Sequence, residues 1–442
     1  MGISPRSFLN GLLINSPMNA SFDPVDTGMV YYVGRHDEVE HHARPLRAYR
    51  NIEICEPEAL PNKVRAGDVC VFYNEFFSRF RDCCLTVQKL GCSTIYAIDG
   101  IVEWRNLWEF PSESGACLWA MRPVLSNKVA CIGRSQARIL ESWGNVGKCE
   151  VVGVPRFDNL RDQKPRNRVL EPFTLLIMTA KNPGFTVEQT DIARQSLSDL
   201  KVWIDTYNSI NARQICPRWR LTGGLDATIQ VPNELRDTTG VDLYAALQAV
   251  DAVVTTPSTA ILESMLLGLP VAILDYTNSP QYVPTAWSIT AKEHFDRVIP
   301  ALMDPPAERL LLQSTLLHDH LECRTPATSR MATLIDEMLK IGQRCQLTRT
   351  INTFPGRILV QDENADHLPE EVFNLQRLFP THSTFSNSDM TLLQVEVAHL
   401  RVELKNKADQ LAPWEAILSR LHQNLLTRVG LKLFGPLVKR FL

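Results

Sequence analysis

The stretch Val250–Tyr276, VDAVVTTPSTAILESMLLGLPVAILDY, contains the clearest signals of secondary structure in the chain. Its first apolar run, 251–255, predicts a buried strand. Thr256 can cap a helix, and Pro257 suits the first helical position, where no N–H donor is needed. A helix is therefore expected over 258–267.

The end of that helix is marked just as clearly. Gly268 can adopt the left-handed conformation that ends a helix, and Pro270 prevents its continuation. The apolar run 271–274 then predicts a second strand. The whole stretch reads as a βαβ unit of a parallel sheet.

Working outward, the same alternation fills two parts of the chain. A helix capped by Ser135 and ended by Gly144 is expected in the first part, and a long helix over 187–207 in the second. Strands are expected at 29–33, 68–73, 94–98, 129–132, 150–154, 173–178 and 218–221. This pattern predicts an α/β protein with two Rossmann-like domains facing a cleft.

The domain organisation follows from these segments and from the polar sequence between them. A tail beginning near Asp389 carries apolar residues at heptad-like spacing, which favours self-association through 389–411. The predicted parts are an N-terminal domain (1–160), a linker (161–172), a C-terminal domain (173–344), a loop-rich segment (345–388) and an amphipathic helical or coiled-coil tail (389–442).

Composition excludes several classes of protein. The 442 residues carry 46 Lys and Arg against 49 Asp and Glu, and this balance argues against a nucleic-acid partner. Eleven cysteines without a C-x-x-C pair predict a reducing, cytoplasmic setting. No apolar run reaches the roughly 18 residues of a membrane span. The basic amphipathic end 431–442 leaves open peripheral contact with a membrane, or docking onto the protein itself.

A histidine-rich run, 35–42, raises the question of a metal. His36, His41 and His42 match no zinc motif in their spacing, and a polar run after a strand is expected to be a loop. Dinucleotide, P-loop and nucleophile-elbow motifs are absent. The sequence therefore predicts chemistry without a metal or a cofactor.

Ser258, Thr259 and Glu263 carry the strongest hint of a ligand. They follow a strand at the start of a helix, where unpaired N–H groups can bind phosphate, and the carboxylate lies one turn further on. The alternative is that the hydroxyls cap the helix and the carboxylate faces solvent.

Two motifs resemble known enzymes. The stretch 250–276 is similar to the nucleotide-binding unit of GT-B glycosyltransferases, especially bacterial envelope enzymes such as lipid-A-disaccharide synthase. Gly153-Val154-Pro155-Arg156-Phe157-Asp158 resembles the Gly-x-Pro-Arg-x-Asp run of CDP-glycerol glycerophosphotransferases and related surface-polysaccharide enzymes. The resemblance implies a GT-B-like fold over about 28–340.

The same resemblance implies a donor site. Ser258 and Thr259 would contact the diphosphate and Glu263 the ribose, while Lys181 would stabilise the leaving group's charge. A surface lysine in a turn is the alternative for Lys181. The loop Thr222-Gly223-Gly224 would approach the nucleobase, although a plain glycine turn is the alternative.

The acceptor site is expected in the first domain. Asp99 precedes Gly100 where similar enzymes carry a His-Gly pair, and a carboxylate there could deprotonate an acceptor hydroxyl, an effect typically worth about 10² to 10⁴ in rate. A turn-forming aspartate is the alternative. Glu103, Arg105 and Arg156 are further candidates for the acceptor or the cleft.

These expectations combine into one hypothesis. The protein would be a metal-independent glycosyltransferase that moves a sugar from a nucleotide-activated donor to a surface or envelope glycan or lipid-linked acceptor. A non-hydrolysing UDP-sugar 2-epimerase and a catalytically silent GT-B scaffold acting through its coiled-coil tail are the alternatives.

Overall fold

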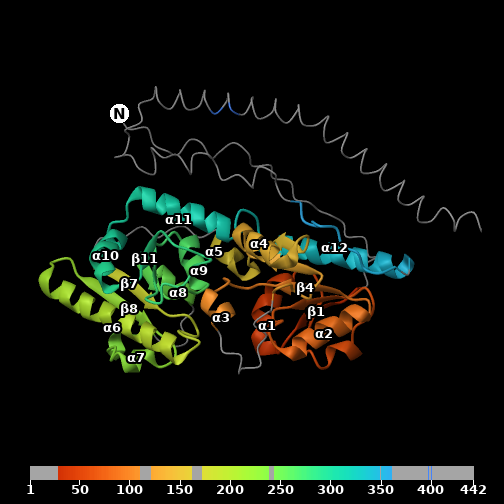
Figure 1. Ribbon diagram of the computed structural model, residues 1–442, viewed down its shortest axis with the longest axis horizontal. Coiled ribbons are helices and arrows are strands. Elements are labelled where there is room, and N and C mark those ends of the chain that lie inside the picture. Colours follow the sequence, from red (N-terminus) through yellow and green to blue (C-terminus); the bar gives the residue numbers. More distant parts are fainter. Residues whose placement is uncertain are drawn as a thin grey trace, which may run out of the picture. The chain divides into compact units, whose positions relative to one another are not determined.

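The computed structural model describes residues 28–109, 121–161, 172–237, 243–348 and 350–360, together with Val397 and Leu400. The chain forms two compact units, Met1–Val372 and Phe373–Leu442. The first unit contains two sheets (Figure 1), and we call residues 28–161 with their sheet the first lobe and residues 172–320 with theirs the second lobe.

The first sheet is parallel throughout and has the order β2-β1-β3-β4-β5-β6. Its strands are short and most of their residues are buried, which suits a sheet covered on both faces. They are β1 (Val30–Val33), β2 (Ile52–Cys55), β3 (Val69–Phe72), β4 (Ser93–Ala97), β5 (Lys128–Cys131) and β6 (Cys149–Val151).

The second sheet is also parallel and has the order β11-β10-β9-β7-β8. Its strands are β7 (Phe173–Met178), β8 (Ile215–Arg220), β9 (Ala252–Thr255), β10 (Val271–Leu274) and β11 (Trp287–Ile289). Two parallel sheets with helices between their strands confirm the predicted α/β class with two Rossmann-like parts.

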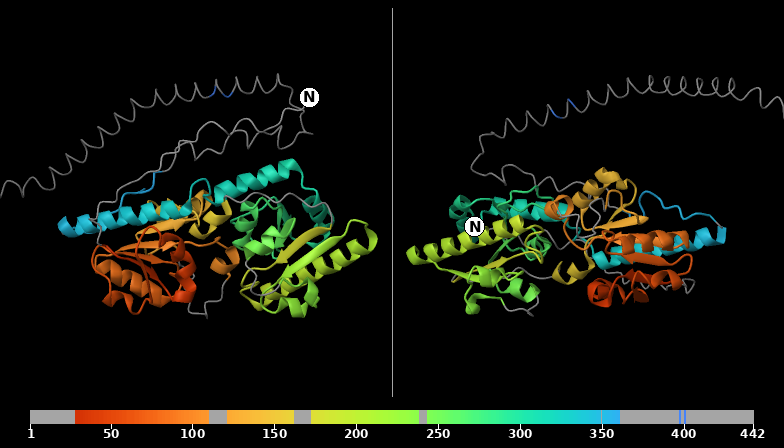
Figure 2. Two further views of the ribbon diagram at one scale, coloured as in Figure 1. Left: turned by 180° about the vertical axis from the view of Figure 1, so that it is seen from behind. Right: turned by 60° about the horizontal axis from the view of Figure 1, so that its bottom comes forward.

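Helices cover both faces of each sheet, as Figure 2 shows from two further directions. Those of the first half are α1 (His36–Ala43), α2 (Ser78–Lys89), α3 (Trp104–Trp108), α4 (Arg134–Leu140) and α5 (Asp158–Arg161). Those of the second half are α6 (Val187–Ile210), α7 (Leu225–Thr228), α8 (Leu243–Gln248), α9 (Ala260–Leu266), α10 (Phe295–Met303), α11 (Ala307–His320) and α12 (Ala327–Thr348).

Successive residues of a strand are buried on opposite faces of each sheet. In β7, Leu175 and Ile177 pack with helices α6 and α10, whereas Leu176 and Met178 pack with α9 and α11. In β1, Tyr31 and Val33 belong in the same way to the core that contains α2 and α4. Each lobe therefore has one core above its sheet and another below it.

Helix α12 follows the second lobe in sequence but packs on the first. Its buried residues Leu334 and Met338 share a core with Val30 and Tyr32 of β1. Figures 1 and 2 show this helix, in blue, along the red and orange lobe. The chain thus passes between the lobes twice.

Three local predictions were wrong, and one strand was missed. The run 35–42 is largely helix α1, because Asp37 and Glu38 lie in its first turn, where negative charge suits the helix dipole. Strand β2 was not predicted.

The other two errors concern helix caps. Helix α4 begins after Gly133 instead of Ser135, whose hydroxyl contacts His320. Helix α9 begins after Thr259 instead of Thr256, because the Thr256 hydroxyl accepts the N–H of Ala180 in a neighbouring loop.

Some predictions fall outside the described residues. They include most of the linker 161–172, most of the segment 345–388, the tail apart from Val397 and Leu400, and the basic end 431–442. Among the helices that are described, none is long and apolar enough to cross a membrane.

Candidate functional site

The first lobe brings three polar side chains together at the carboxyl ends of neighbouring strands. His42 comes from α1, which follows β1; Tyr73 follows β3; and Asp99 follows β4 by two residues. Strands β1, β3 and β4 are adjacent and parallel, so their carboxyl ends meet at one edge of the sheet, where ligands bind in folds of this class.

Contacts on every side fix the orientation of His42. Its Nε2 lies 3.2 Å from the Oδ2 of Asp99. Its ring stacks on Tyr73 with 4.1 Å between centroids and an interplanar angle of 12°, and the ring of His41 lies tilted against it by 42°, with 3.7 Å between centroids. The imidazole is buried, whereas about half of the Asp99 side chain, 49%, stays exposed.

The charge state of the pair follows from its surroundings. Burial favours a raised pKa for Asp99, but the hydrogen bond from His42 and the positive charges of His42 and Arg156 outweigh it, and the pKa is lowered. Burial, with the nearby charges of His42 and Arg156, lowers the pKa of His41 to about 4. At neutral pH the site therefore combines an ionised carboxylate with a neutral His41.

Arg156 connects this site to the second lobe. Its Nη2 donates to the carbonyl oxygen of Asp99 at 3.0 Å, and its Nη1 donates to Oε1 of Glu263 in α9, also at 3.0 Å. Two residues that the sequence assigned to opposite sides of the cleft, Asp99 and Glu263, are thus bridged by one guanidinium.

Two other residues of the Gly-x-Pro-Arg-x-Asp run contact the segment that connects the second lobe to α12. Gly153 has a φ of +90°, and a Cβ there would lie 2.5 Å from the carbonyl oxygen of Glu322, so no larger residue fits without strain. Both carboxylate oxygens of Asp158 accept N–H groups at the start of α12, those of Ala327 and Thr328, at 2.8 Å each. The motif therefore has a structural role as well.

A second contact joins the lobes at the start of α9. The Oγ1 of Thr259 accepts the N–H of Ile101 at 3.2 Å. The same oxygen lies 2.3 Å from where a Cβ of Gly100 would be, which explains the glycine at this position. Ser258 is engaged differently, with its hydroxyl 3.3 Å from that of Thr255.

Two loops of the second lobe support each other. The Thr222 hydroxyl donates to the carbonyl of Ala180 at 2.6 Å, and the Thr222 N–H donates to Thr179 at 2.9 Å. Lys181 follows directly and is exposed. The predicted nucleobase loop and the predicted leaving-group cation are therefore neighbours.

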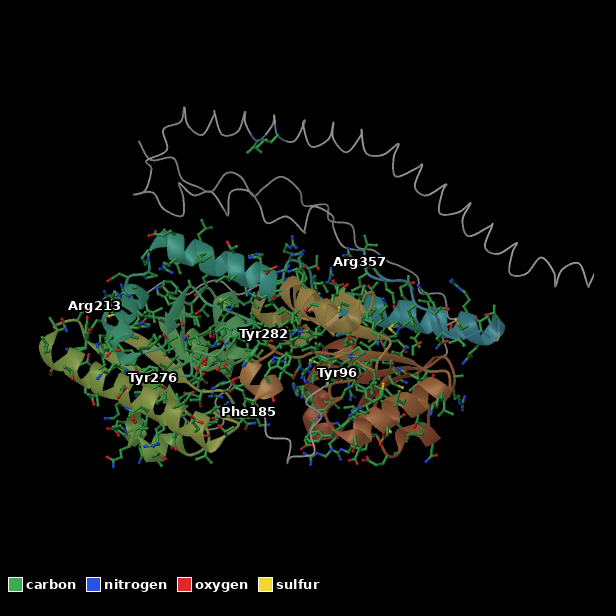
Figure 3. The ribbon with its side chains drawn as sticks, in the orientation of Figure 1. Tyr96, Phe185, Arg213, Tyr276, Tyr282 and Arg357 are labelled. Carbon is green, nitrogen blue, oxygen red and sulfur yellow. The ribbon has the colours of Figure 1, made fainter. Side chains whose placement is uncertain are left out.

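Residues of both lobes line one hollow of about 520 Å³. The first lobe contributes His41, His42, Tyr73 and Asp99, and the second contributes Lys181. A smaller hollow of about 140 Å³ lies on the other side of Asp99 and is lined also by Tyr96 and Glu103. Tyr96 of the first lobe and Tyr282 of the second are labelled in Figure 3.

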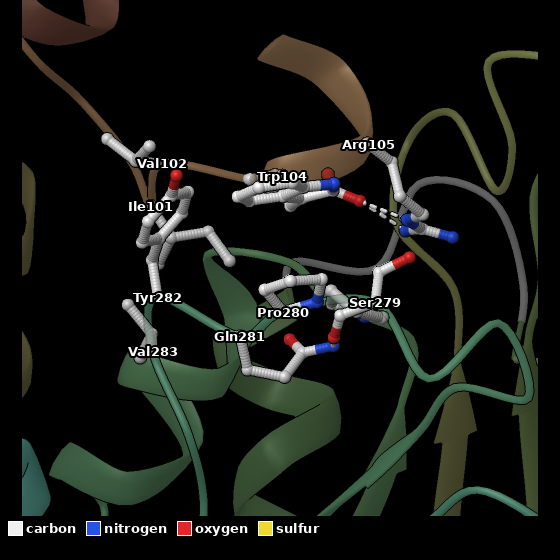
Figure 4. Close-up of a pocket in the computed structure, with 11 residues that line it drawn as sticks. Ile101, Val102, Trp104, Arg105, Ser279, Pro280, Gln281, Tyr282 and Val283 are labelled. Atoms are coloured by element: carbon white, nitrogen blue, oxygen red, sulfur yellow. Dashed lines mark hydrogen bonds and ion pairs between the residues drawn. The ribbon is translucent and has the colours of Figure 1, made fainter. Parts of the chain in front are cut away.

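Glu103 and Arg105 pair with each other (Figure 4). The Arg105 guanidinium is buried and also donates to the carbonyl of Pro183 in the second lobe at 3.4 Å. Burial raises the pKa of Glu103, although Arg105 opposes this effect. The space beside them, lined also by Tyr282, is only about 10 Å³, room for a single water.

The structure thus joins Asp99 and Glu263 through Arg156, joins Thr259 separately to Ile101, and places Lys181 at the hollow beside Asp99. The sequence did not identify His42 and Tyr73 as members of this site. The available signal was positional, since each follows a strand of the same parallel sheet as Asp99, but that signal needs the strand order β1-β3-β4, which the sequence did not provide.

Several solved structures resemble this chain in fold but share little sequence identity with it. No protein-family profile and no curated protein matches the chain. A putative UDP-N-acetylglucosamine 2-epimerase from Listeria monocytogenes is 13% identical, with a TM-score of 0.49 over 75% of this chain and 99% of its own. The wall teichoic acid polymerase TagF is 10% identical, with a TM-score of 0.43 over 71% and 89%. A glycosyltransferase of kitacinnamycin is 11% identical, with a TM-score of 0.44 over 71% and 99%.

Proposed function

We propose that the protein transfers a sugar from a nucleotide-activated donor to a hydroxyl of a glycan or lipid-linked acceptor. One observation supports this most directly: Asp99 of the first lobe and Lys181 of the second line the same hollow. A carboxylate that faces a cation across a cleft suits a reaction in which a hydroxyl loses its proton while charge grows on a departing phosphate.

The donor would occupy the second lobe. Lys181 would stabilise the diphosphate, with Ser258 and Thr259 at the start of α9, and Glu263 would bind the ribose. Thr259 and Glu263 are bonded to Ile101 and Arg156 in this structure, so a nucleotide that uses their oxygens must replace these two bonds.

The acceptor would approach from the first lobe, through the hollow beside Asp99. The lowered pKa of Asp99 makes it a weak proton acceptor when it acts alone. Its contact with His42 provides a partner that can share the proton, so the pair is proposed to act together. Every cysteine in the described residues is a free thiol, which suits the cytoplasmic setting that we propose.

The donor site can be tested by thermal unfolding with UDP, GDP, CDP, CMP and ADP. A nucleotide that binds only the folded chain stabilises it by about 2.7 kcal/mol at 100 times its dissociation constant. We expect one nucleotide to raise the Tm of the wild type, and Glu263→Ala to reduce that rise. Glu234→Ala, which removes an exposed carboxylate elsewhere in the second lobe, is the matched control.

An unchanged shift in Glu263→Ala would remove the ribose assignment, and no shift with any nucleotide would contradict the proposed function. Incubation with the donor alone then separates transfer from epimerisation, because an epimerase converts its donor without an acceptor.

A further inference from the structure

The exposed His41 belongs to the cluster beside Asp99, and the proposed function gives it no task. Adjacent residues of a helix point about 100° apart, so neighbouring side chains usually diverge. Here the rings of His41 and His42 lie 3.7 Å apart, at the end of α1 that faces Asp99. Two imidazoles and one carboxylate therefore converge on one point.

The spacing of their ligand atoms is close to that of a coordination sphere. One nitrogen of each histidine and one carboxylate oxygen of Asp99 lie within 4.8 Å of one another. A tetrahedral zinc ion with bonds of about 2.0 to 2.1 Å places its ligands roughly 3.3 Å apart. The Nε2 of His42 and the Oδ2 of Asp99 already lie 3.2 Å apart, so mainly the exposed His41 has to move closer.

The surroundings suit a bound cation with an open position. Tyr73 stacks on His42 and limits the orientations of its ring. The positive charge of Arg156, the nearest cation to Asp99, is compensated by Glu263. The hollow beside the cluster leaves room for water or a substrate oxygen as a fourth ligand.

We propose that His41, His42 and Asp99 form a binding site for a divalent metal ion of the zinc class. The ligand set of two imidazoles and one carboxylate is one that such ions bind, with a fourth position left for water. This departs from the expectation of metal-independent chemistry. It does not rest on the proposed function, because the ion is detected without nucleotide or turnover.

The test is a titration of the full chain, freed of metal by dialysis against a chelator, with Co²⁺ followed by visible absorption. We expect one equivalent of Co²⁺ to give a four-coordinate spectrum and Zn²⁺ to displace it. His41→Ala and Asp99→Asn should weaken binding by more than about tenfold, the loss typical of damage to a metal site. His36→Ala, which removes an exposed histidine from the same helix, should bind as the wild type does.

Three results would overturn the proposal. The first is that the wild type gives no Co²⁺ spectrum. The second is that His41→Ala and Asp99→Asn bind Co²⁺ with wild-type affinity. The third is thiolate-to-cobalt absorption, which would show that cysteines bind the ion. Thermal unfolding of each variant without metal shows whether it is folded, and His41→Ala provides the decisive comparison because that side chain is exposed.

Discussion

At the scale of single residues, Asp99 combines a side-chain contact with His42 and half-exposure to the hollow. Substitution by asparagine keeps its shape but removes the charge that faces His42. We expect Asp99→Asn to lower the turnover number by about 10² or more, the usual contribution of a positioned base. Nucleotide binding, measured by thermal shift, should stay normal, since Asp99 is in the other lobe. Near-normal turnover would remove Asp99 from the mechanism.

His320 is the residue that most clearly links stability to pH. Burial lowers its pKa to about 4, against about 6.5 when unfolded, so between these values the unfolded chain binds a proton that the native chain does not. The free energy of unfolding should therefore fall as the pH drops through this window, by at most about 3 kcal/mol from this group.

Urea unfolding between pH 7 and pH 4.5 measures this effect. His41 titrates in the same window, so the informative quantity is the difference between the wild type and His320→Gln, whose stability should depend less on pH. His318→Gln is the control on the same helix. An equal pH dependence in wild type and His320→Gln would contradict the assignment.

At the scale of elements, the start of α12 depends on a side chain from far away in the sequence. Asp158 accepts two N–H groups there, although 169 residues separate it from Ala327. Loss of a helix cap costs about 0.5–2 kcal/mol, and we expect Asp158→Ala to lower the free energy of unfolding by about that amount.

Urea unfolding is again the measurement. Asp158→Asn keeps one acceptor oxygen and should lie between the alanine variant and the wild type, whereas Asp82→Ala, at an exposed position of α2, should change little. An unaltered stability of Asp158→Ala would mean that water replaces the cap at no cost.

The elements also show what the sequence could predict. The βαβ unit around β9 was predictable because its apolar runs, Gly268 and Pro270 act locally. Strand β2 was missed because Glu53 interrupts a short apolar run, and α1 because its stabilising charges resemble a polar loop. The cap residues were misplaced since their hydroxyls bond to loops or helices remote in sequence.

The candidate site shows the same difference between local signals, which the sequence reveals, and contacts between remote residues, which it does not. Asp99 and the start of α9 could be named because each comes soon after a strand, and Lys181 because similar enzymes carry a basic residue after the corresponding strand. The pairings His42 with Asp99 and Arg156 with Glu263 could not be predicted, because they depend on strand order and on how the lobes meet.

At the scale of the whole molecule, a buried ion pair ties the segment 354–359 to the first lobe. Lys128 and Glu150 are almost fully buried and lie 2.9 Å apart. Lys128 also donates to the carbonyls of Pro355 and Gly356, and Glu150 accepts the N–H groups of Ile358 and Leu359. The pair therefore supplies hydrogen-bond partners to the backbone of this segment, which is not part of a sheet.

Removing one charge of this pair leaves the other buried without compensation. We expect Glu150→Gln to lower the free energy of unfolding by about 3–5 kcal/mol, and the N–H groups of Ile358 and Leu359 to exchange faster with deuterium. The double variant Lys128→Met with Glu150→Leu should recover part of the loss. Wild-type stability of Glu150→Gln would show that the pair is dispensable.

Gly153 lies against Glu322, and Asp158 caps the start of α12, so the end of the first lobe packs on the segment that returns from the second. The bonds from Ile101 to Thr259 and from Arg156 to Glu263 both join the lobes, so separation of the lobes would break them together. Access of a ligand to the second lobe and reshaping of the hollow beside Asp99 become one coupled movement.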